Sequence, residues 1–275
     1  MFKITETRLR IRADQPVHRM QTGISMPSGR PVTIKAASRC LLLLVTAVFV
    51  RAGNAGTFEP SQKDFYVYPP YCKAKMADLP ENRKHVWRNK FPVDEQQVAF
   101  WKRQLGPDWY DLEQYCAGLT HISRANDIGW LRSNKESAAA EFRAAAAAIN
   151  QARLRSAPRN PFWQELSLRY AEAIGGAGQY AEAMKVLQDV TALNPKNTNA
   201  YVLHARLTAR RGDLNAAIAQ LEAGLAAGAG RGPILYYLAS DYYELGDYKR
   251  AREYAQQAEQ AGMKMDNLKS RLPDE

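Results

Sequence analysis

The sequence predicts an all-α fold, a solenoid of stacked helical hairpins. The main observation is a 34-residue step in the C-terminal half, where Gly178, Gly212 and Gly246 recur in register. After residue 107 apolar residues follow helical spacing, and no alternating strand pattern is present. Residues 135–154 are rich in alanine, a strong helix former that permits close helix packing. We therefore expect three repeats within residues 161–263, preceded by a degenerate fourth hairpin.

Two alanine columns keep the same step and indicate how each hairpin packs. A small residue midway in the first helix lets the second helix lie close, and another marks the crossing point on the second helix. The glycines supply the tight turn between the two helices. The columns are Ala171, Ala205 and Ala239 in the first helices, and Ala183, Ala217 and Ala251 in the second.

This pattern resembles the tetratricopeptide repeat family, whose period is about 34 residues. The third unit is the closest match, with Leu238-Ala239, Tyr242, Gly246-Asp247-Tyr248 and Ala251. The first unit ends with Pro195, as the family usually does. The second departs at Thr208, where an aromatic residue is common, and at Gly224. The resemblance covers residues 161–263 and is specific for fold, but it says little about function.

The resemblance also implies a binding surface, because the first helices of successive repeats line a concave groove in this family. Arginine there offers forked donors for carboxylate or phosphate, and tyrosine offers rigid contact area. The alternative is that these positions are ordinary solvated surface. The groove positions carried over are Leu168, Glu172, Asn199, Val202, Arg206, Arg210, Tyr236, Ser240, Tyr243 and Glu244.

Chaperone-type repeats clamp a C-terminal carboxylate with a Lys–Asn pair at groove positions. Those positions hold Val202 and Arg206, or Tyr236 and Ser240, in this sequence. A partner of that kind is therefore disfavoured.

Two segments precede the repeats. Residues 56–107 form a region rich in aromatics and proline, which we expect to be irregular apart from one helix over 93–105. "FYVYPPYC" predicts extended backbone, because a proline pushes its predecessor out of the helical region. Residues 108–160 form the degenerate hairpin, with Asp108 capping its first helix. Residues 161–275 hold the repeats and a short C-terminal cap after Gly262.

The first 55 residues predict a secretory signal peptide. The apolar run "RCLLLLVTAVFV" follows Lys35, and Gly53 and Ala55 place small residues before a cut ahead of Gly56. The run is too short to cross a bilayer, which needs about 20 residues. A buried strand or an uncleaved anchor is the alternative. The upstream extension is long, so translation starting at Met20 or Met26 is a further alternative.

The charge distribution disfavours nucleic acid as a partner. The formal net charge is +10, but residues 1–55 carry nine basic and two acidic residues, a net +7. Removal of this segment leaves a net charge of +3, so most of the excess positive charge lies in the predicted targeting segment. We expect the mature chain to be periplasmic, without a transmembrane span.

Export would leave two cysteines, Cys72 and Cys116, in an oxidising compartment. An even pair without metal-like neighbours predicts a disulfide. Cys116 lies on the apolar stripe of its helix, so we expect its side chain to point inward. Two separate buried thiols remain an alternative. A reactive Cys72 is another, because Lys73 and Lys75 could lower its pKa.

The sequence predicts no enzyme, cofactor or metal site. It contains no H-E-x-x-H, C-x-x-C or G-x-S-x-G motif and no phosphate-binding glycine loop between a strand and a helix. His85, His121 and His204 are far apart in the sequence. We therefore expect a scaffold or adaptor of the bacterial cell envelope that binds a peptide segment or a partner subunit. The alternatives are an assembly component that uses its N-terminal aromatic region, and an enzyme whose site sequence spacing does not reveal.

Overall fold

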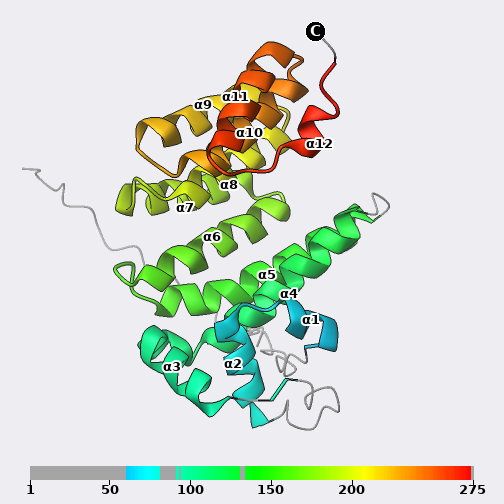
Figure 1. The fold of residues 1–275 in the computed structure, drawn as a ribbon. Helices are drawn as coiled ribbons and strands as arrows, with labels where there is room; N and C mark the ends of the chain where they lie inside the picture. Colours follow the sequence, from blue (N-terminus) through cyan, green and yellow to red (C-terminus); the bar gives the residue numbers. More distant parts are fainter. Residues whose placement is uncertain (1–59, 81–90, 93, 131–133, 274–275) are drawn as a thin grey trace, which may run out of the picture. The chain divides into compact units, whose positions relative to one another are not determined.

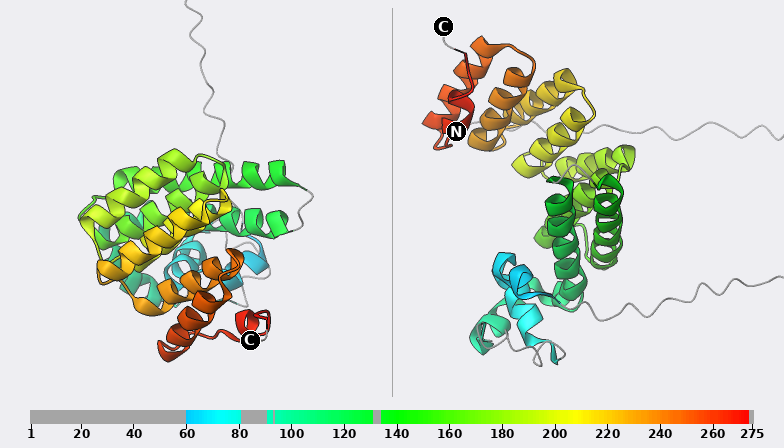
Figure 2. Two further views of the ribbon diagram at one scale, coloured as in Figure 1. Left: turned by 90° about the horizontal axis from the view of Figure 1, so that it is seen from above. Right: turned by 90° about the vertical axis from the view of Figure 1, so that its right-hand side faces the viewer.

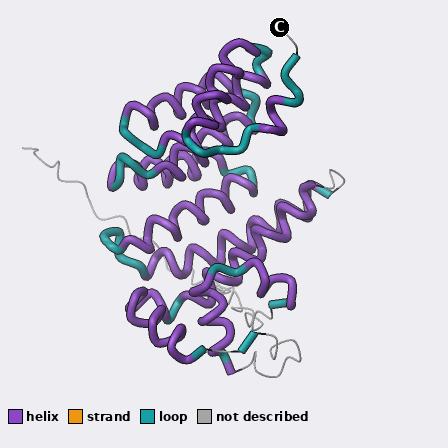
Figure 3. The backbone as a smooth tube through the Cα atoms, viewed as in Figure 1, coloured by secondary structure: helices purple, strands orange, loops and turns teal. Residues whose placement is uncertain are grey.

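The computed structural model of the protein describes residues 60–80, 91–92, 94–130 and 134–273. Within these ranges the chain is helical or loop, with no strand (Figure 3). The all-α prediction is confirmed. The predicted signal peptide lies outside the described residues.

Four helix pairs follow one another in chain order from residue 112 to residue 260 (Figure 1). Neighbouring helices pack within each pair and against the next pair, and Figure 2 shows the same succession from two further directions. The first helices of successive pairs also contact one another. The pairs are α4 (Leu112–Trp130) with α5 (Lys135–Arg155), α6 (Pro161–Gly176) with α7 (Tyr180–Leu193), α8 (Thr198–Arg210) with α9 (Leu214–Ala226), and α10 (Arg231–Glu244) with α11 (Tyr248–Gln260).

The repeat columns have the roles that their residue types predict. All six column alanines are 0–1% exposed, which places them at the helix contacts. Gly178, Gly212 and Gly246 have φ of 91°, 89° and 79°, the left-handed conformation in which glycine ends a helix without steric cost. A short helix, α12 (Asp266–Lys269), follows α11 and buries Met265 and Leu268 at the end of the stack.

The degenerate hairpin of α4 and α5 is closely packed, as its alanines suggest. A Cβ atom on Gly118 of α4 would clash with the side chain of Ile149 on α5. Ala145 and Ile149 are both fully buried. The alanines of α5 and Gly118 of α4 therefore allow these two helices to approach, as they do in the repeats.

The N-terminal region contains more helix than we predicted. The expectation of extended backbone over "FYVYPPYC" is wrong for most of it, because α1 spans Gln62–Val67 and α2 spans Pro70–Asp78. Ser61 and Asp64 form a capping box, and Pro70 occupies the first position of α2, where a missing N–H costs nothing. Only Tyr68 and Pro69 between them are extended.

The boundary near residue 107 also needs correction. Helix α3 spans Glu95–Leu105, as predicted, but Gly106–Trp109 forms a short 3₁₀ helix and α4 begins at Leu112. Asp108 therefore does not cap α4. Its carboxylate accepts a hydrogen bond from the Asn160 amide at 2.5 Å, and burial raises its pKa.

A disulfide joins the N-terminal region to the helix stack. Cys72 on α2 is bonded to Cys116 on α4, with a Cα–Cα distance of 5.7 Å. The predicted pairing is confirmed, and both residues are 0% exposed. Around the bond, the ring of Tyr71 lies 5.7 Å from that of Phe162 on α6, and the hydroxyls of Tyr68 and Thr120 are hydrogen bonded at 2.8 Å. Segment 68–72 is thus fastened to the first two hairpins.

Candidate binding groove

Five of the ten predicted groove residues line one hollow between α6 and α8. Its volume is about 150 Å³. We call it the α6–α8 groove. Its predicted members are Leu168, Glu172, Asn199, Val202 and Arg206, and Glu165, Arg169 and Leu203 complete its lining.

The groove has an apolar floor and a polar rim. Leu168 and Leu203 are buried at 7% and 9% exposure, so Leu168 offers less surface than its predicted role suggests. Asn199 is exposed at the rim. The Arg206 guanidinium lies 6.0 Å from the centre of the Tyr237 ring and makes no ion pair with a carboxylate in the described part of the chain. The groove therefore presents donors that are available to a ligand.

A charged network on α6 forms the other wall. Arg169 donates to Glu165 Oε1 at 3.0 Å through Nε, and to Glu172 Oε2 at 2.9 Å through Nη1. The Tyr115 hydroxyl donates to the same Glu165 oxygen at 2.9 Å. Burial opposes the charge on Arg169, but the two carboxylates outweigh it and raise the pKa of the guanidinium above its usual value. Burial raises the pKa of Tyr115, so its hydroxyl stays protonated and acts as a donor.

Sequence reasoning missed Glu165 and Arg169. Their spacing of four residues, with Glu172 three further on, is the helical ion-pair pattern and could have indicated them. It also missed a second hollow of about 430 Å³ beside the groove, which shares all three of these residues. This α4–α6 hollow is closed on its other side by α4 and by segment 67–71.

The predicted residues on α10 lie outside the α6–α8 groove. Tyr236 is 37% exposed and meets the Tyr237 ring edge-on at 5.2 Å, so it is available to a partner. Tyr243 is less accessible, because the Arg271 guanidinium lies 4.6 Å from its ring centre. Glu244 accepts a hydrogen bond from the same arginine at 3.5 Å. Ser240 is half-buried on the same helix, and Arg210 is exposed at the end of α8.

A comparison with protein families agrees with this geometry. Residues 176–240 match the family model described as the tetratricopeptide repeat. Residues 176–240 are therefore tetratricopeptide repeat sequence. The match runs from the last residue of α6 through α7, α8 and α9 and most of α10. No curated protein matches the chain.

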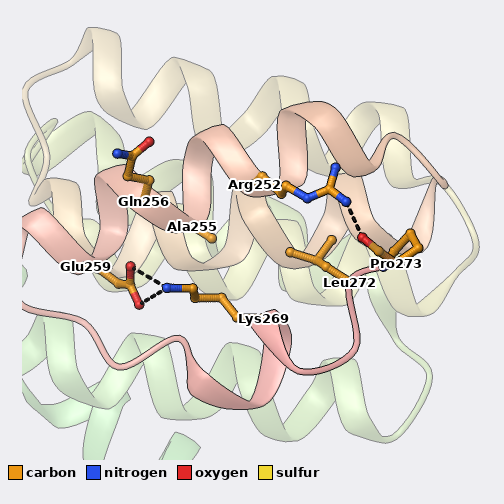
Figure 4. A pocket seen from close by; sticks show the side chains of 7 residues that line it. All are labelled: Arg252, Ala255, Gln256, Glu259, Lys269, Leu272 and Pro273. Carbon is orange, nitrogen blue, oxygen red and sulfur yellow. Dashed lines mark hydrogen bonds and ion pairs between the residues drawn. The ribbon is translucent and has the colours of Figure 1, made fainter. Parts of the chain in front are cut away.

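A third hollow, with a volume of about 500 Å³, lies between α11 and the C-terminal segment. Figure 4 shows how the side chains span it: Lys269 donates to Glu259, and Arg252 donates to the carbonyl oxygen of Pro273. The charged side chains at this site are thus engaged in holding the terminal cap. For that reason we consider the α6–α8 groove the better candidate for a partner.

The described residues offer little support for other kinds of site. In those ranges, no group of three or more His, Cys, Asp or Glu side chains is placed to hold a metal ion. His121 Nδ1 lies 2.6 Å from Glu141 Oε2. Among the described helices none has the length and apolarity needed to span a membrane.

Proposed function

We propose that the protein is an exported, non-enzymatic scaffold of the bacterial cell envelope that holds an extended segment of a partner protein. The tetratricopeptide repeats support a protein-interaction scaffold. The observation that carries the finer proposal is the α6–α8 groove, in which five predicted positions form one hollow with a buried floor.

The groove chemistry suits a peptide better than a small molecule. Its volume of about 150 Å³ is too small to enclose a drug-sized ligand, which needs a pocket of about 300 Å³ or more. Asn199 and Arg206 can donate to the carbonyl or carboxylate oxygens of an extended segment lying across the two helices. Tyr236 on α10 extends the contact area toward the next repeat.

We expect the Arg206→Ala/Tyr236→Ala double variant to lose binding while it keeps its fold. Loss of an interface anchor costs about 2 kcal/mol or more, which corresponds to at least about a thirtyfold weaker complex. The measurement compares proteins that co-purify with tagged wild type and with the variant from envelope extracts, by quantitative mass spectrometry. Arg206 and Tyr236 are preferable to Tyr243, whose replacement would also disturb the Arg271 contact.

A Tyr66→Ser/Phe100→Ser variant is the matched comparison, because it removes two exposed aromatic residues of the N-terminal region, 58% and 42% exposed. Partner loss in this variant with unchanged binding in the groove variant would favour the second candidate, an assembly component that uses its aromatic region. The exposure of these two rings is the observation that favours that candidate. Deletion of residues 56–107 would not separate the two, because it also removes Cys72.

Export rests on the n-, h- and c-region pattern of residues 35–55 and draws support from the Cys72–Cys116 bond, because disulfides persist in oxidising compartments. We expect the mature chain from native cells to begin at or near Gly56. N-terminal sequencing of protein from the periplasmic fraction checks this. Recovery of the intact N-terminus from the cytoplasm would contradict export and leave the groove proposal standing.

A further inference from the structure

The α4–α6 hollow differs from the α6–α8 groove in what closes it. Residues of segment 67–71 lie beside the face of α4 that bears Leu119 and Thr120, and line the hollow together with that face. The hydrogen bond between Tyr68 and Thr120 and the disulfide one residue beyond Tyr71 fix that segment. The hollow is therefore a formed site with one wall made by the chain's own N-terminal region.

The charged residues that line the hollow carry a net negative charge. It is lined by two carboxylates, Glu165 and Glu172, and by a single cation, Arg169. Arg169 binds one oxygen of each carboxylate, and Tyr115 donates to the oxygen of Glu165 that Arg169 already holds. The second oxygens, Glu165 Oε2 and Glu172 Oε1, accept no hydrogen bond from the described residues. A net negative charge with two available acceptors faces the space.

Apart from the polar Thr120, Ser123 and Asn126, the remaining lining is suited to an alkyl chain. Val67, Leu119 and Ile122 contribute aliphatic surface, and Tyr68, Tyr71 and Tyr115 contribute aromatic rings. Lysine and arginine bury their methylene stems along such surface while the charged end reaches a polar group. An acidic side chain would meet two like charges here.

We propose that the α4–α6 hollow is a subsite for a lysine or arginine side chain of the partner segment that lies in the α6–α8 groove. This inference rests on the proposed function, and Glu165, Arg169 and Glu172 join the two hollows because they line both. The cationic end of that side chain would bind Glu165 Oε2 and Glu172 Oε1. The N-terminal segment thereby takes part in recognition through the wall it forms.

The test is a selection of phage-displayed random dodecapeptides on the full-length chain. We expect lysine or arginine to be enriched at one peptide position. The chain's net charge of +10 would attract acidic peptides non-specifically, so enrichment of lysine or arginine would not arise from that non-specific attraction. In the Glu165→Gln/Glu172→Gln variant the enrichment should disappear. It should persist in Glu136→Gln/Glu253→Gln, which removes the same charge from exposed sites on α5 and α11.

A synthetic peptide from the selection gives the magnitude. Replacing its basic residue by norleucine should weaken binding to wild type about tenfold or more, the effect of losing a hydrogen bond to a charged group, and should change binding to the double Gln variant little. Enriched peptides without a basic residue, or basic enrichment that survives in the double Gln variant, would overturn the subsite and leave the peptide groove intact. Failure to enrich any peptide would contradict the proposed function itself.

Discussion

The Cys72→Ala/Cys116→Ala variant is expected to lose about 4 kcal/mol of unfolding free energy. The bond closes a loop of 44 residues, and a loop of this length restricts the unfolded chain by about that amount on the chain-entropy model. The expected loss is large because segment 60–80 has little core of its own. It is attached to the stack by this bond, by the aromatic contacts of Tyr71, by polar contacts to α4 and by the buried side chains of Phe65 and Met76, which join the core of the stack.

Urea unfolding monitored by circular dichroism measures this effect, with Cys40→Ala as the matched control. Cys40 lies outside the described residues and outside the bond, so its replacement should leave the unfolding midpoint unchanged. Because Cys72 and Cys116 are both 0% exposed, we also expect dithiothreitol to reduce the bond only when urea is present. Equal stability of the double variant and wild type, or rapid reduction of the native protein, would show that the bond contributes little to the fold.

The parts of the structure that the sequence could predict are those set by local or periodic constraints. The turn glycines follow from a 34-residue step, and Cys116 could be placed inward because it lies on a helical stripe. Helices α1 and α2 were missed because the two consecutive prolines outweighed their start signals. Both signals are present in the sequence: the Ser61–Asp64 capping box and the proline at the first position of α2.

The lining of the candidate groove could be predicted only in part, for a physical reason. The groove positions carried over from the family assume that no other segment covers the exposed face of each first helix. On α6 and α8 five of these residues do line one groove. The assumption fails at both ends, where other segments cover the face. Arg271 of the C-terminal segment engages Tyr243 and Glu244, and Tyr68 and Tyr71 lie against α4. Contacts between residues this far apart in the sequence, 27 positions for Arg271 and Glu244 and 52 for Tyr68 and Thr120, leave no trace in local spacing.

A second large effect is expected for the Asp241→Leu variant, which we predict to unfold with a higher free energy than wild type. Asp241 on α10 is 8% exposed, and its carboxylate makes neither a hydrogen bond nor an ion pair with another described residue. Its counterpart 34 residues earlier is Leu207, which packs closely against Gly175 of the preceding repeat. A carboxylate therefore occupies a position where the previous repeat buries an apolar side chain.

Burial, together with the nearby charge of Glu244, raises the pKa of Asp241 from 3.8 to about 6. Because the folded-state pKa lies above the unfolded value, the folded state binds the proton more tightly, and ionisation destabilises the fold. This destabilisation is absent below about pH 4, grows between pH 4 and 6, and is complete above that range, where the shift corresponds to about 3 kcal/mol at most. Asp241→Leu should therefore raise the unfolding free energy at pH 7 by up to that amount and by less at pH 4.

Asp241→Asn is the matched control, because it removes the charge but keeps a buried polar group of the same size. We expect it to abolish the same pH-dependent component while stabilising less than leucine, since a buried amide without a partner is itself unfavourable. Chemical unfolding of the three proteins at pH 4, 5, 6 and 7 gives the comparison. If wild type and Asp241→Leu differ by the same amount at every pH, the gain comes from apolar packing alone, and the carboxylate of Asp241 is not held in the environment described here.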